Sequence, residues 1–262
     1  MNESTIADFD MNFFSLKGKN AIVTGGNTGL GQAFTLALAK AGSSVLAASI
    51  MPDDGITGAL VEAAGSRYAY TMTDITVEDN PKKVVDACID AFGSVDILVN
   101  CAGRSINEPD VLKYTRKQWD PMVALNLTAA FEMSHECAKH MIPQGSGKII
   151  NIGSVFSFLG GQWSPAYAAT KHGLMGFTKA YCDELAQFGI QVNGIAPGYF
   201  ATALTADTRA NTGSNQRVLD HIPANRWGQT QDLMGAAVFL ASHASDYING
   251  QMLSVDGGYL VR

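Results

Sequence analysis

The sequence predicts a single α/β domain in which helices cover both faces of a doubly wound, Rossmann-type sheet of seven parallel strands. Three observations predict this fold. Short apolar runs alternate with longer helical patterns along the whole chain, an order typical of parallel βαβ units. A glycine-rich turn follows the first apolar run directly, as in dinucleotide-binding folds. The 262 residues show no break in composition, and one large core accommodates a chain of that length.

Composition limits the classes of function. Hydrophobic residues make up 47% of the chain and charged residues 16%, as in a globular enzyme with many buried strands. The net charge is −6 and basic residues form no runs, so we expect neither nucleic acid nor a membrane as partner. The four cysteines and five histidines lack the spacing of ligands, so no metal site is predicted. The N-terminus lacks a signal-peptide pattern, so we expect a cytoplasmic protein.

The elements begin after an N-terminal extension at residues 1–16. Residues 21–23 predict a short apolar strand, and a glycine turn follows it. The next helix carries Phe34, Ala37 and Leu38 on one face, which is the spacing of an amphipathic helix packed on a sheet. Strand, glycine turn and helix together predict the first βα unit.

Three more strands and two helices follow in alternation. The runs SVLAAS and YAYTMTDI predict the second and third strands, and VDILVNCAG predicts a fourth strand buried on both faces. Asn80 and Pro81 begin a helix between the third and fourth strands. Thr115 and Gln118 form a capping box before a long helix that runs to Met141.

The second half of the chain completes the sheet. KIINIGS predicts the fifth strand, a helix begins at Pro165, and IQVNGIAPG predicts the sixth strand. The polar segment at residues 199–223 is too long for a plain connection, so we expect a substrate lid there. A helix at residues 231–241 and the strand GQMLSVDGG end the domain, which spans residues 17–262.

The glycine turn has the pattern T-G-x-x-x-G-x-G, formed by Thr24, Gly25, Gly29 and Gly31. Glycine allows a positive φ and a close approach of backbone N–H groups to a pyrophosphate at the positive end of a helix. A glycine cluster alone is more often an ordinary turn. Its place between a strand and a helix favours a dinucleotide site.

The end of the second strand bears on the choice between NAD and NADP. An acidic residue there accepts from the ribose hydroxyls, whereas a basic residue pairs with the 2′-phosphate of NADP. Ser49 and Ile50 carry no charge, and Thr28 in the glycine turn is not basic. Asp53 and Asp54 follow and would repel a 2′-phosphate. NAD is therefore expected over NADP.

The stretch at residues 153–171, GSVFSFLGGQWSPAYAATK, predicts a reaction centre. Tyr167 and Lys171 are four residues apart on a helix, so their side chains share one face. The ammonium ion would lower the tyrosine pKa from about 10 toward the range that a general acid/base needs. Ser154 would hold the reacting group. The alternatives are a surface tyrosine beside a solvated lysine and, for Asn126, an ordinary core asparagine.

A resemblance makes these motifs specific. The motifs are Thr24-Gly25-x-x-x-Gly29-x-Gly31, Asn100-Cys-Ala-Gly, Asn126, Ser154, Tyr167-x-x-x-Lys171 and Pro197-Gly198. In order and spacing they resemble the short-chain dehydrogenase/reductase family, over about residues 16–262. The resemblance implies a Rossmann-fold oxidoreductase that uses a nicotinamide cofactor and acts on CH–OH groups of a small molecule, usually as a homotetramer.

The resemblance also implies roles for single residues. Tyr167 would move the alcohol proton, and Lys171 would lower the pKa of Tyr167 and hold the nicotinamide ribose. Ser154 would bind the substrate carbonyl, and Asn126 would support a water relay. Cys101 departs from the asparagine that the family commonly has, and its small thiol is expected to pack there.

Two sets of binding residues follow. The residues expected to contact the cofactor are Thr24, Gly25, Asn27, Thr28, Gly29, Leu30, Gly31, Ser49, Asp74, Ile75, Asn100, Ala102, Gly103, Tyr167, Lys171, Pro197, Gly198 and Thr202. The residues expected to contact the substrate are Arg104, Ser154, Phe156, Trp163, Tyr167 and Tyr199. For Asp74 the sequence leaves two roles open, a turn cap and an acceptor for the adenine amine.

Within the family, GNTGLGQ and the C-terminal tail from IPANRWGQ onward resemble the 2-deoxy-D-gluconate 3-dehydrogenase and 2-dehydro-3-deoxy-D-gluconate 5-dehydrogenase group. That resemblance implies a sugar acid as substrate, and Arg104 is the best placed cation for its carboxylate, followed by Arg209 and Arg217. Trp163 stands where that group often has a basic residue, and it suits a more apolar substrate. A polyol, a ketone or a hydroxysteroid therefore remains an alternative, and so does a non-catalytic nucleotide sensor on the same fold.

Overall fold

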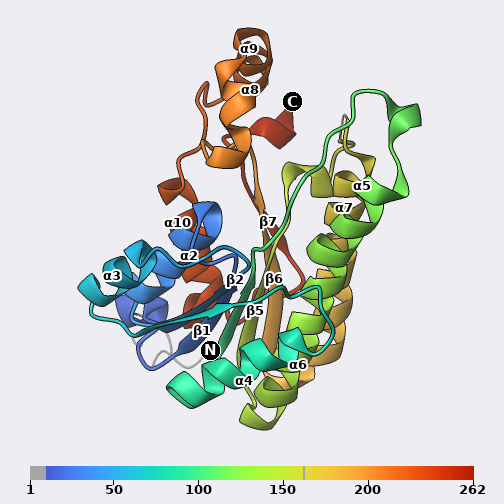
Figure 1. Ribbon diagram of the computed structural model, residues 1–262. Helices are drawn as coiled ribbons and strands as arrows, with labels where there is room; N and C mark the ends of the chain where they lie inside the picture. The colour runs from blue at the N-terminus through green and yellow to red at the C-terminus, as the bar shows by residue number, and fades with distance from the viewer. Residues whose placement is uncertain (1–9, 162) are drawn as a thin grey trace.

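The computed structural model describes residues 10–161 and 163–262. Its centre is a seven-stranded sheet with the order β3-β2-β1-β4-β5-β6-β7, and all six strand pairs are parallel. This confirms the predicted fold class (Figure 1). The strands are β1 Asn20–Thr24, β2 Ser44–Ser49, β3 Tyr68–Met72, β4 Ile97–Asn100, β5 Gly147–Ile152, β6 Ile190–Pro197 and β7 Met252–Val255.

Helices cover both faces of the sheet because successive residues of the central strands point to opposite sides. In β1, Val23 packs with α2 and α10, whereas Ile22 packs with α4 and α6. Apolar side chains therefore occupy both faces of the strand, as the uninterrupted apolar runs predict. The helices are α2 Gly29–Lys40, α3 Ile56–Ala63, α4 Asn80–Phe92, α5 Arg116–Val123, α6 Ala129–Gln144, α7 Pro165–Leu185, α8 Ala206–Ala210, α9 Thr212–His221 and α10 Gln231–Ala241.

The long helix predicted up to Met141 has a different internal form. Helix α5 runs into a π-helical turn at Ala124–Thr128, and α6 continues from there. A π turn inserts one extra residue per turn and is often found at functional sites. Here it holds Asn126. Helix α3, which the sequence analysis does not predict, adds a short element between β2 and β3.

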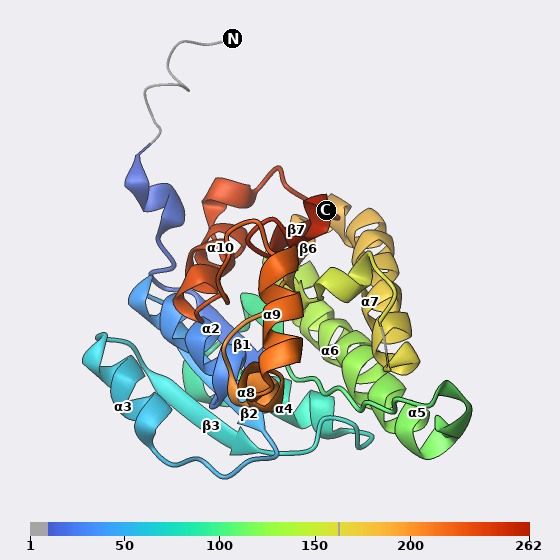
Figure 2. The same cartoon turned by 90° about the horizontal axis from the view of Figure 1, so that it is seen from above.

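The segment at residues 199–223 contains a 3-10 turn at Ala203–Thr205, then α8 and α9. These helices stand above the carboxyl edge of the sheet (Figure 1), and α9 lies beside the C-terminus in both ribbon views (Figures 1 and 2). At the other end of the chain, a 3-10 turn at Met11–Phe14 packs on α10, with the rings of Phe14 and Phe239 6.4 Å apart. Residues 1–9 of the predicted N-terminal extension lie outside the described residues. In the described part of the chain, no helix has the length and apolar character that crossing a membrane requires.

Candidate active site and cofactor cleft

The glycine turn between β1 and α2 adopts a backbone conformation that larger residues would strain or block. Gly25 and Gly29 have φ values of 68° and 52°, in the left-handed region that favours glycine. A Cβ on Gly31 would lie 2.1 Å from the carbonyl oxygen of Gly25. The start of α2 therefore lies directly against the turn, and its free N–H groups face the cleft above β1. This arrangement fits a pyrophosphate.

Thr24 joins this turn to the one after β4. Its Oγ1 accepts hydrogen bonds from the backbone N–H groups of Cys101 and Ala102, each at 3.0 Å. A Cβ on Gly25 would touch Ala102 at 3.4 Å. The side chain of Asn100 turns away into the fold, where its amide donates to Ser134 and Asn151. At this position, only the backbone faces the cleft.

The end of the cleft beyond β2 is formed by an ordered loop. The Asn27 amide donates to the carbonyl oxygens of Met51 and Pro52, at 3.3 and 3.2 Å. Its Oδ1 is buried and has no hydrogen-bond partner among the described residues. A buried acceptor without a partner is rare in proteins, so a donor from a bound molecule suits this position. Ser49 Oγ accepts from the Met51 N–H at 3.1 Å.

Asp74 and Ile75 follow β3 at the same edge of the sheet. Asp74 Oδ1 accepts from the backbone N–H and the hydroxyl of Thr76, so this carboxylate caps a turn. Ile75 is buried in the core. Pro197 ends β6, and the Gly198 N–H donates to Val255 of the neighbouring strand at 3.0 Å. Thr202 caps the 3-10 turn at Ala203–Thr205.

The structure brings the four predicted catalytic residues together beyond the carboxyl ends of β4 and β5. Lys171 is buried on α7, and its Nζ donates to the carbonyl oxygen of Ile152 at 2.6 Å. The same Nζ lies 5.5 Å from the ring centroid of Tyr167, one helical turn earlier. The hydroxyl of Ser154, shortly after β5, is close enough to Tyr167 to lower its pKa. Tyr167 therefore has both the serine hydroxyl and the lysine ammonium nearby.

Burial dominates the electrostatics of this pair. Burial raises the pKa of Tyr167 above its ordinary value, and the neighbouring Ser154 hydroxyl opposes that rise. Burial lowers the pKa of Lys171 from 10.5 to about 8. The predicted net lowering of the Tyr167 pKa is therefore wrong for this structure. The reason is that burial, which disfavours both charged forms, is the largest effect on each pKa.

Asn126 lies in the π turn and braces the chain opposite Lys171. Its Oδ1 accepts from the Arg104 N–H, and its Nδ2 donates to the Arg104 carbonyl, each at 2.9 Å. A Cβ on Gly103 would lie 3.2 Å from Asn126 Oδ1 and 3.8 Å from Lys171 Nζ. The Nδ2 also donates to Thr170 Oγ1 at 3.3 Å. Sequence reasoning misses Thr170, since only its contact with Asn126 sets it apart.

Cys101 is a further residue near the site. Its thiol is close enough to interact electrostatically with Lys171, and burial raises its pKa to about 12. The thiol therefore stays protonated at neutral pH, which makes it a poor nucleophile. It packs against the core, as the sequence predicts.

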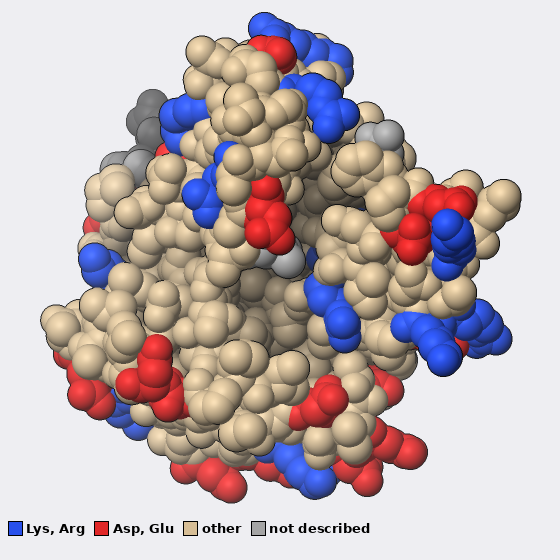
Figure 3. Space-filling model, turned by 45° about the horizontal axis from the view of Figure 1, so that its top comes forward, with Lys and Arg blue, Asp and Glu red and all other residues tan. Residues whose placement is uncertain are grey.

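Aromatic side chains line the substrate side. The ring of Phe156 stands edge-on to Tyr167 at 6.0 Å and to Tyr199 at 6.5 Å. Trp163 is 42% exposed and has a φ of 67°, unusual for a bulky residue. The Arg104 side chain is exposed and has no hydrogen bond or ion pair within the described residues. The upper face is hollowed here, with charged side chains around the rim (Figure 3).

The other two candidate arginines, both within residues 199–223, already have partners. Arg209 Nη2 donates to the carbonyl oxygen of Thr202 at 2.9 Å, and Arg217 Nη2 donates to Ser214 Oγ at 3.2 Å. Of the three arginines that the sequence suggests for a carboxylate, Arg104 alone has its guanidinium unengaged within the described residues. This ranking agrees with the sequence analysis.

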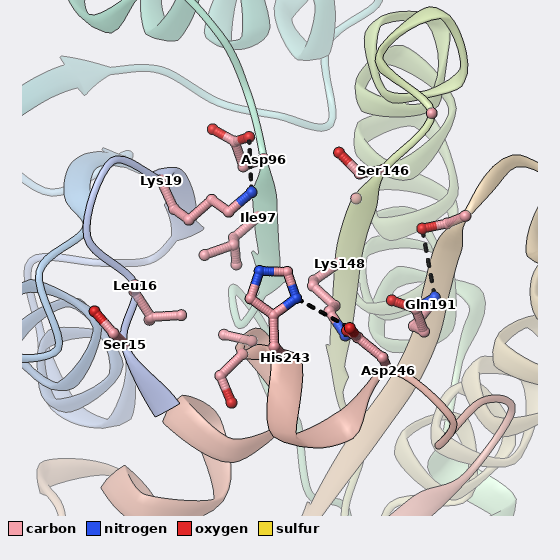
Figure 4. Close-up of a pocket in the computed structure, with 15 residues that line it drawn as sticks. Ser15, Leu16, Lys19, Asp96, Ile97, Ser146, Lys148, Gln191, His243 and Asp246 are labelled. Atoms are coloured by element: carbon pink, nitrogen blue, oxygen red, sulfur yellow. Dashed lines mark hydrogen bonds and ion pairs between the residues drawn. The ribbon is translucent and has the colours of Figure 1, made fainter. Parts of the chain in front are cut away.

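A second hollow, of about 290 Å³, lies at the opposite end of the sheet. Its charged side chains are paired (Figure 4): Lys148 with Asp246 at 2.7 Å, His243 with the same carboxylate at 3.0 Å, and Lys19 with Asp96 at 3.8 Å. The Lys148–Asp246 pair joins β5 to the turn after α10, and the Lys19–Asp96 pair joins the residues just before β1 and β4. The predicted catalytic residues are all absent from its lining. Among the described residues, no group of three or more His, Cys, Asp or Glu side chains could hold a metal ion.

Comparisons with known proteins agree with this geometry. A family model described as enoyl-(acyl carrier protein) reductase matches residues 25–260. The chain is 64% identical to the uncharacterized oxidoreductase YgcW of Escherichia coli over the full length of both chains. It is 47% identical to the 2-dehydro-3-deoxy-D-gluconate 5-dehydrogenase of the same species, covering 95% of this chain and 98% of that one.

A solved structure agrees as well. The gluconate 5-dehydrogenase of Burkholderia cenocepacia, in complex with NADP and tartrate, matches with a TM-score of 0.90 and 35% identity. The match covers 96% of this chain and 98% of that chain. The strand order, the glycine turn, the assembled Ser154, Tyr167 and Lys171 and these matches lead to one conclusion. The chain belongs to the short-chain dehydrogenase/reductase family and is an NAD(P)-dependent oxidoreductase that acts on CH–OH groups.

Proposed function

We propose that the protein reversibly oxidises a secondary alcohol of a deoxy-gluconate type sugar acid with NAD. The observation that carries the chemistry is the buried Lys171 next to the half-buried Tyr167, with the Ser154 hydroxyl nearby. The substrate class draws on the names of two relatives, a 2-dehydro-3-deoxy-D-gluconate 5-dehydrogenase and a gluconate 5-dehydrogenase. The unengaged Arg104 at the site supports the same class, because a carboxylate needs a cation.

The proposed mechanism assigns one task to each catalytic residue. The nicotinamide, when bound, accepts or supplies the hydride. The Ser154 hydroxyl donates to the substrate oxygen and orients it toward Tyr167. The Tyr167 phenolate oxygen takes the alcohol proton during oxidation and returns it during reduction. Lys171 would donate to a ribose hydroxyl of the coenzyme, and its ammonium charge would offset part of the cost that burial imposes on the phenolate.

Asn126 acts through the backbone in this mechanism. By holding both polar groups of Arg104, its side chain fixes the turn that passes beside Lys171. These two hydrogen bonds hold the turn after β4 in place below the site. The π turn positions the Asn126 amide to make them. A water relay to Lys171 would start from here.

We propose that the coenzyme lies along the cleft from the end of β2 to α7. The backbone of the glycine turn and the side chains of Tyr167 and Lys171 would hold it, together with residues at the ends of the strands. The glycine-turn residues are Gly25, Asn27, Thr28, Gly29, Leu30 and Gly31. The residues at the strand ends are Thr24, Ser49, Asp74, Ile75, Asn100, Ala102, Gly103, Pro197, Gly198 and Thr202. The orphaned Asn27 Oδ1 and the glycine cradle support this placement.

NAD is proposed over NADP for an electrostatic reason. Residues 24–31 and 49–55 contain no lysine or arginine, so no cation from these segments would meet a 2′-phosphate. Asp53 and Asp54 follow β2 closely enough to raise the pKa of Tyr68 on β3, after burial, the larger cause. Their negative charge at this end of the cleft would repel the 2′-phosphate of NADP. The Burkholderia cenocepacia relative binds NADP, so the preference has to be measured.

The assay that tests this function follows NADH formation at 340 nm with the purified protein, NAD or NADP, and a panel of alcohols. We expect turnover of a deoxy-gluconate or gluconate with NAD, and a higher kcat/KM for NAD than for NADP. Activity confined to neutral polyols or hydroxysteroids would overturn the sugar-acid assignment. It would indicate that the apolar side chains of Phe156 and Trp163 determine the substrate. No turnover with any alcohol, despite tight NADH binding, would favour a nucleotide sensor.

A substitution in the same assay tests the carboxylate clamp. Arg104→Leu should raise the KM for the sugar acid by roughly 10- to 100-fold, because a charge-assisted hydrogen bond of about 1.5–3 kcal/mol is lost. The KM for NAD should stay unchanged. Arg116→Leu is the matched control, since this arginine is exposed and pairs with Asp120 on α5. An unchanged sugar-acid KM in Arg104→Leu would exclude Arg104 as the clamp.

We also propose a homotetramer that works in the cytoplasm, with residues 199–223 as a substrate lid. An aromatic surface cluster on the outer sides of α6 and α7 supports the assembly. Phe131 is 42% exposed, and its ring packs against those of His135, Phe177 and Tyr181. Clustered exposed aromatic rings mark protein–protein interfaces. The four free cysteines agree with a reducing compartment.

Phe131→Asp should break the tetramer. In a symmetric, apolar contact, the new carboxylate would lie close to the same carboxylate of the partner subunit. It would also lose its hydration, and both effects destabilise the contact. Light scattering coupled to size exclusion should therefore give a mass of one half or one quarter of the wild-type value. Leu112→Asp, at a more exposed apolar position in the 3-10 turn before α5, should leave the mass unchanged. Equal masses for wild type and Phe131→Asp would place the interface elsewhere.

A further inference from the structure

The last residues of the chain fasten the lid. The Ala224 N–H donates to the Gly257 carbonyl at 3.0 Å, directly after α9. Arg262 Nη1 donates to the Asp220 carbonyl in the last turn of α9 at 2.9 Å. Residues 256–262 therefore hold the end of α9 at two points, and we name them the C-terminal clasp. The C-terminus lies beside α9 in both ribbon views (Figures 1 and 2).

The C-terminal clasp is a folded turn. Asp256 accepts hydrogen bonds from the backbone N–H groups of Gly258 and Leu260, at 2.8 and 2.9 Å. Gly257 and Gly258 have φ values of 66° and 89°. A Cβ on Gly258 would lie 2.9 Å from a ring carbon of Pro223. The turn thus packs closely against the segment after α9, so movement of one would displace the other.

Aromatic rings connect the C-terminal clasp to the catalytic tyrosine. The Tyr259 ring lies 4.2 Å from His221 of α9 and 5.1 Å from Tyr199, centroid to centroid. Burial and the neighbouring Tyr259 both raise the pKa of Tyr199, burial being the larger cause. From Tyr199 the contacts continue through Phe156 to Tyr167, at 6.5 and 6.0 Å. One continuous row of rings runs from the lid to the reaction centre.

We propose that Tyr259 is a positioning residue that fixes the lid over the substrate and so sets substrate affinity. It contacts the lid through His221 and the substrate wall through Tyr199. None of the four catalytic side chains shares a ring contact with Tyr259. Loss of the Tyr259 ring should therefore weaken substrate binding and leave the hydride and proton steps intact. The inference rests on the proposed function for its substrate.

The test compares Tyr259→Ala with Tyr259→Phe and Tyr247→Ala. Tyr259→Ala should raise the sugar-acid KM about 10-fold with kcat within about twofold, the signature of lost uniform binding. Tyr259→Phe keeps the ring contacts and should restore most of the affinity. Tyr247 is fully exposed, so Tyr247→Ala should match the wild type. An unchanged sugar-acid KM in Tyr259→Ala would overturn the proposal. A general loss, in which substrate affinity, NADH affinity and melting temperature all fall together, would overturn it as well.

A second readout needs no substrate. Limited proteolysis within residues 203–221 should be faster in Tyr259→Ala than in wild type, because the lid has lost its attachment. His221→Ala removes the same ring contact from the lid side, so its effect and that of Tyr259→Ala should not add in the double variant. Additive effects, or unchanged proteolysis, would sink the proposal. If the wild type turns over no sugar acid, the proposed function fails, while the proteolysis experiment still decides the role of Tyr259.

Discussion

Tyr167→Phe is expected to lower kcat by about 10²- to 10⁴-fold, the usual contribution of a general acid/base. The substitution removes only the hydroxyl. The phenyl ring keeps its edge-on contact with Phe156 and its place beside Lys171. NADH binding, followed by quenching of protein fluorescence or by calorimetry, should therefore stay within about twofold of the wild type.

Tyr114→Phe is the matched control for this result. It also removes one tyrosine hydroxyl near the site, one that donates to the Ile106 carbonyl at 3.3 Å. Its kcat should remain close to that of the wild type. A Tyr167→Phe enzyme with more than a tenth of the wild-type kcat would mean that another group moves the proton. Loss of NADH binding together with folding would mean that Tyr167 is mainly structural.

Lys171→Met should abolish turnover and change how stability depends on pH. The Lys171 pKa is about 8 in the folded protein and 10.5 as an ordinary lysine. Below pH 8 both states hold the proton, and burial of the ammonium destabilises the fold by its full amount. Between pH 8 and 10.5 the unfolded chain binds more protons than the folded one, so the wild type gains stability as pH rises. Methionine does not titrate, so the variant lacks this gain.

The size of the difference follows from the two pKa values. A pKa lowered from 10.5 to about 8 corresponds to at most about 3 kcal/mol. The hydrogen bond to Ile152 is also lost, which costs about 1–3 kcal/mol at every pH. The test is therefore the difference in unfolding free energy between wild type and Lys171→Met, measured by urea denaturation without coenzyme from pH 7 to pH 10.

We expect that difference to shift in favour of the wild type by about 1–3 kcal/mol as pH rises across this range. Lys139→Met is the control, because Lys139 is an exposed lysine on α6 that pairs with Glu136. Its curve should run parallel to that of the wild type. Parallel curves for Lys171→Met would show that the buried ammonium keeps an ordinary pKa, and would remove the electrostatic part of the proposed mechanism.

Local signals explain which elements the sequence predicts well. Helix α4 begins at Asn80 and α10 spans Gln231–Ala241, as predicted. Proline at a helix start and apolar residues at helical spacing are properties of neighbouring residues, so they can be read without the fold. The i,i+4 pair of Tyr167 and Lys171 is local in the same way. Helix α3 carries glycine and threonine inside a short span, which leaves little signal.

The missed features depend on contacts between distant residues. The π turn at Ala124–Thr128 is held by the bonds of Asn126 to Arg104, 22 residues away in the chain. The pKa values of Tyr167 and Lys171 follow from burial, which spacing does not reveal. The attachment of Tyr259 to His221 joins the C-terminus to the lid across 38 residues of sequence. These features require the assembled fold.

The bonds from Thr24 to the turn after β4 have a consequence for the thermodynamics of coenzyme binding. Thr24 joins two loops whose positions in the chain are separated by 77 residues, and Asn126 braces the next turn. The loops are thus ordered during folding, and the loss of their conformational entropy belongs to folding rather than to association. A preformed cleft of this kind should bind its coenzyme with little backbone rearrangement.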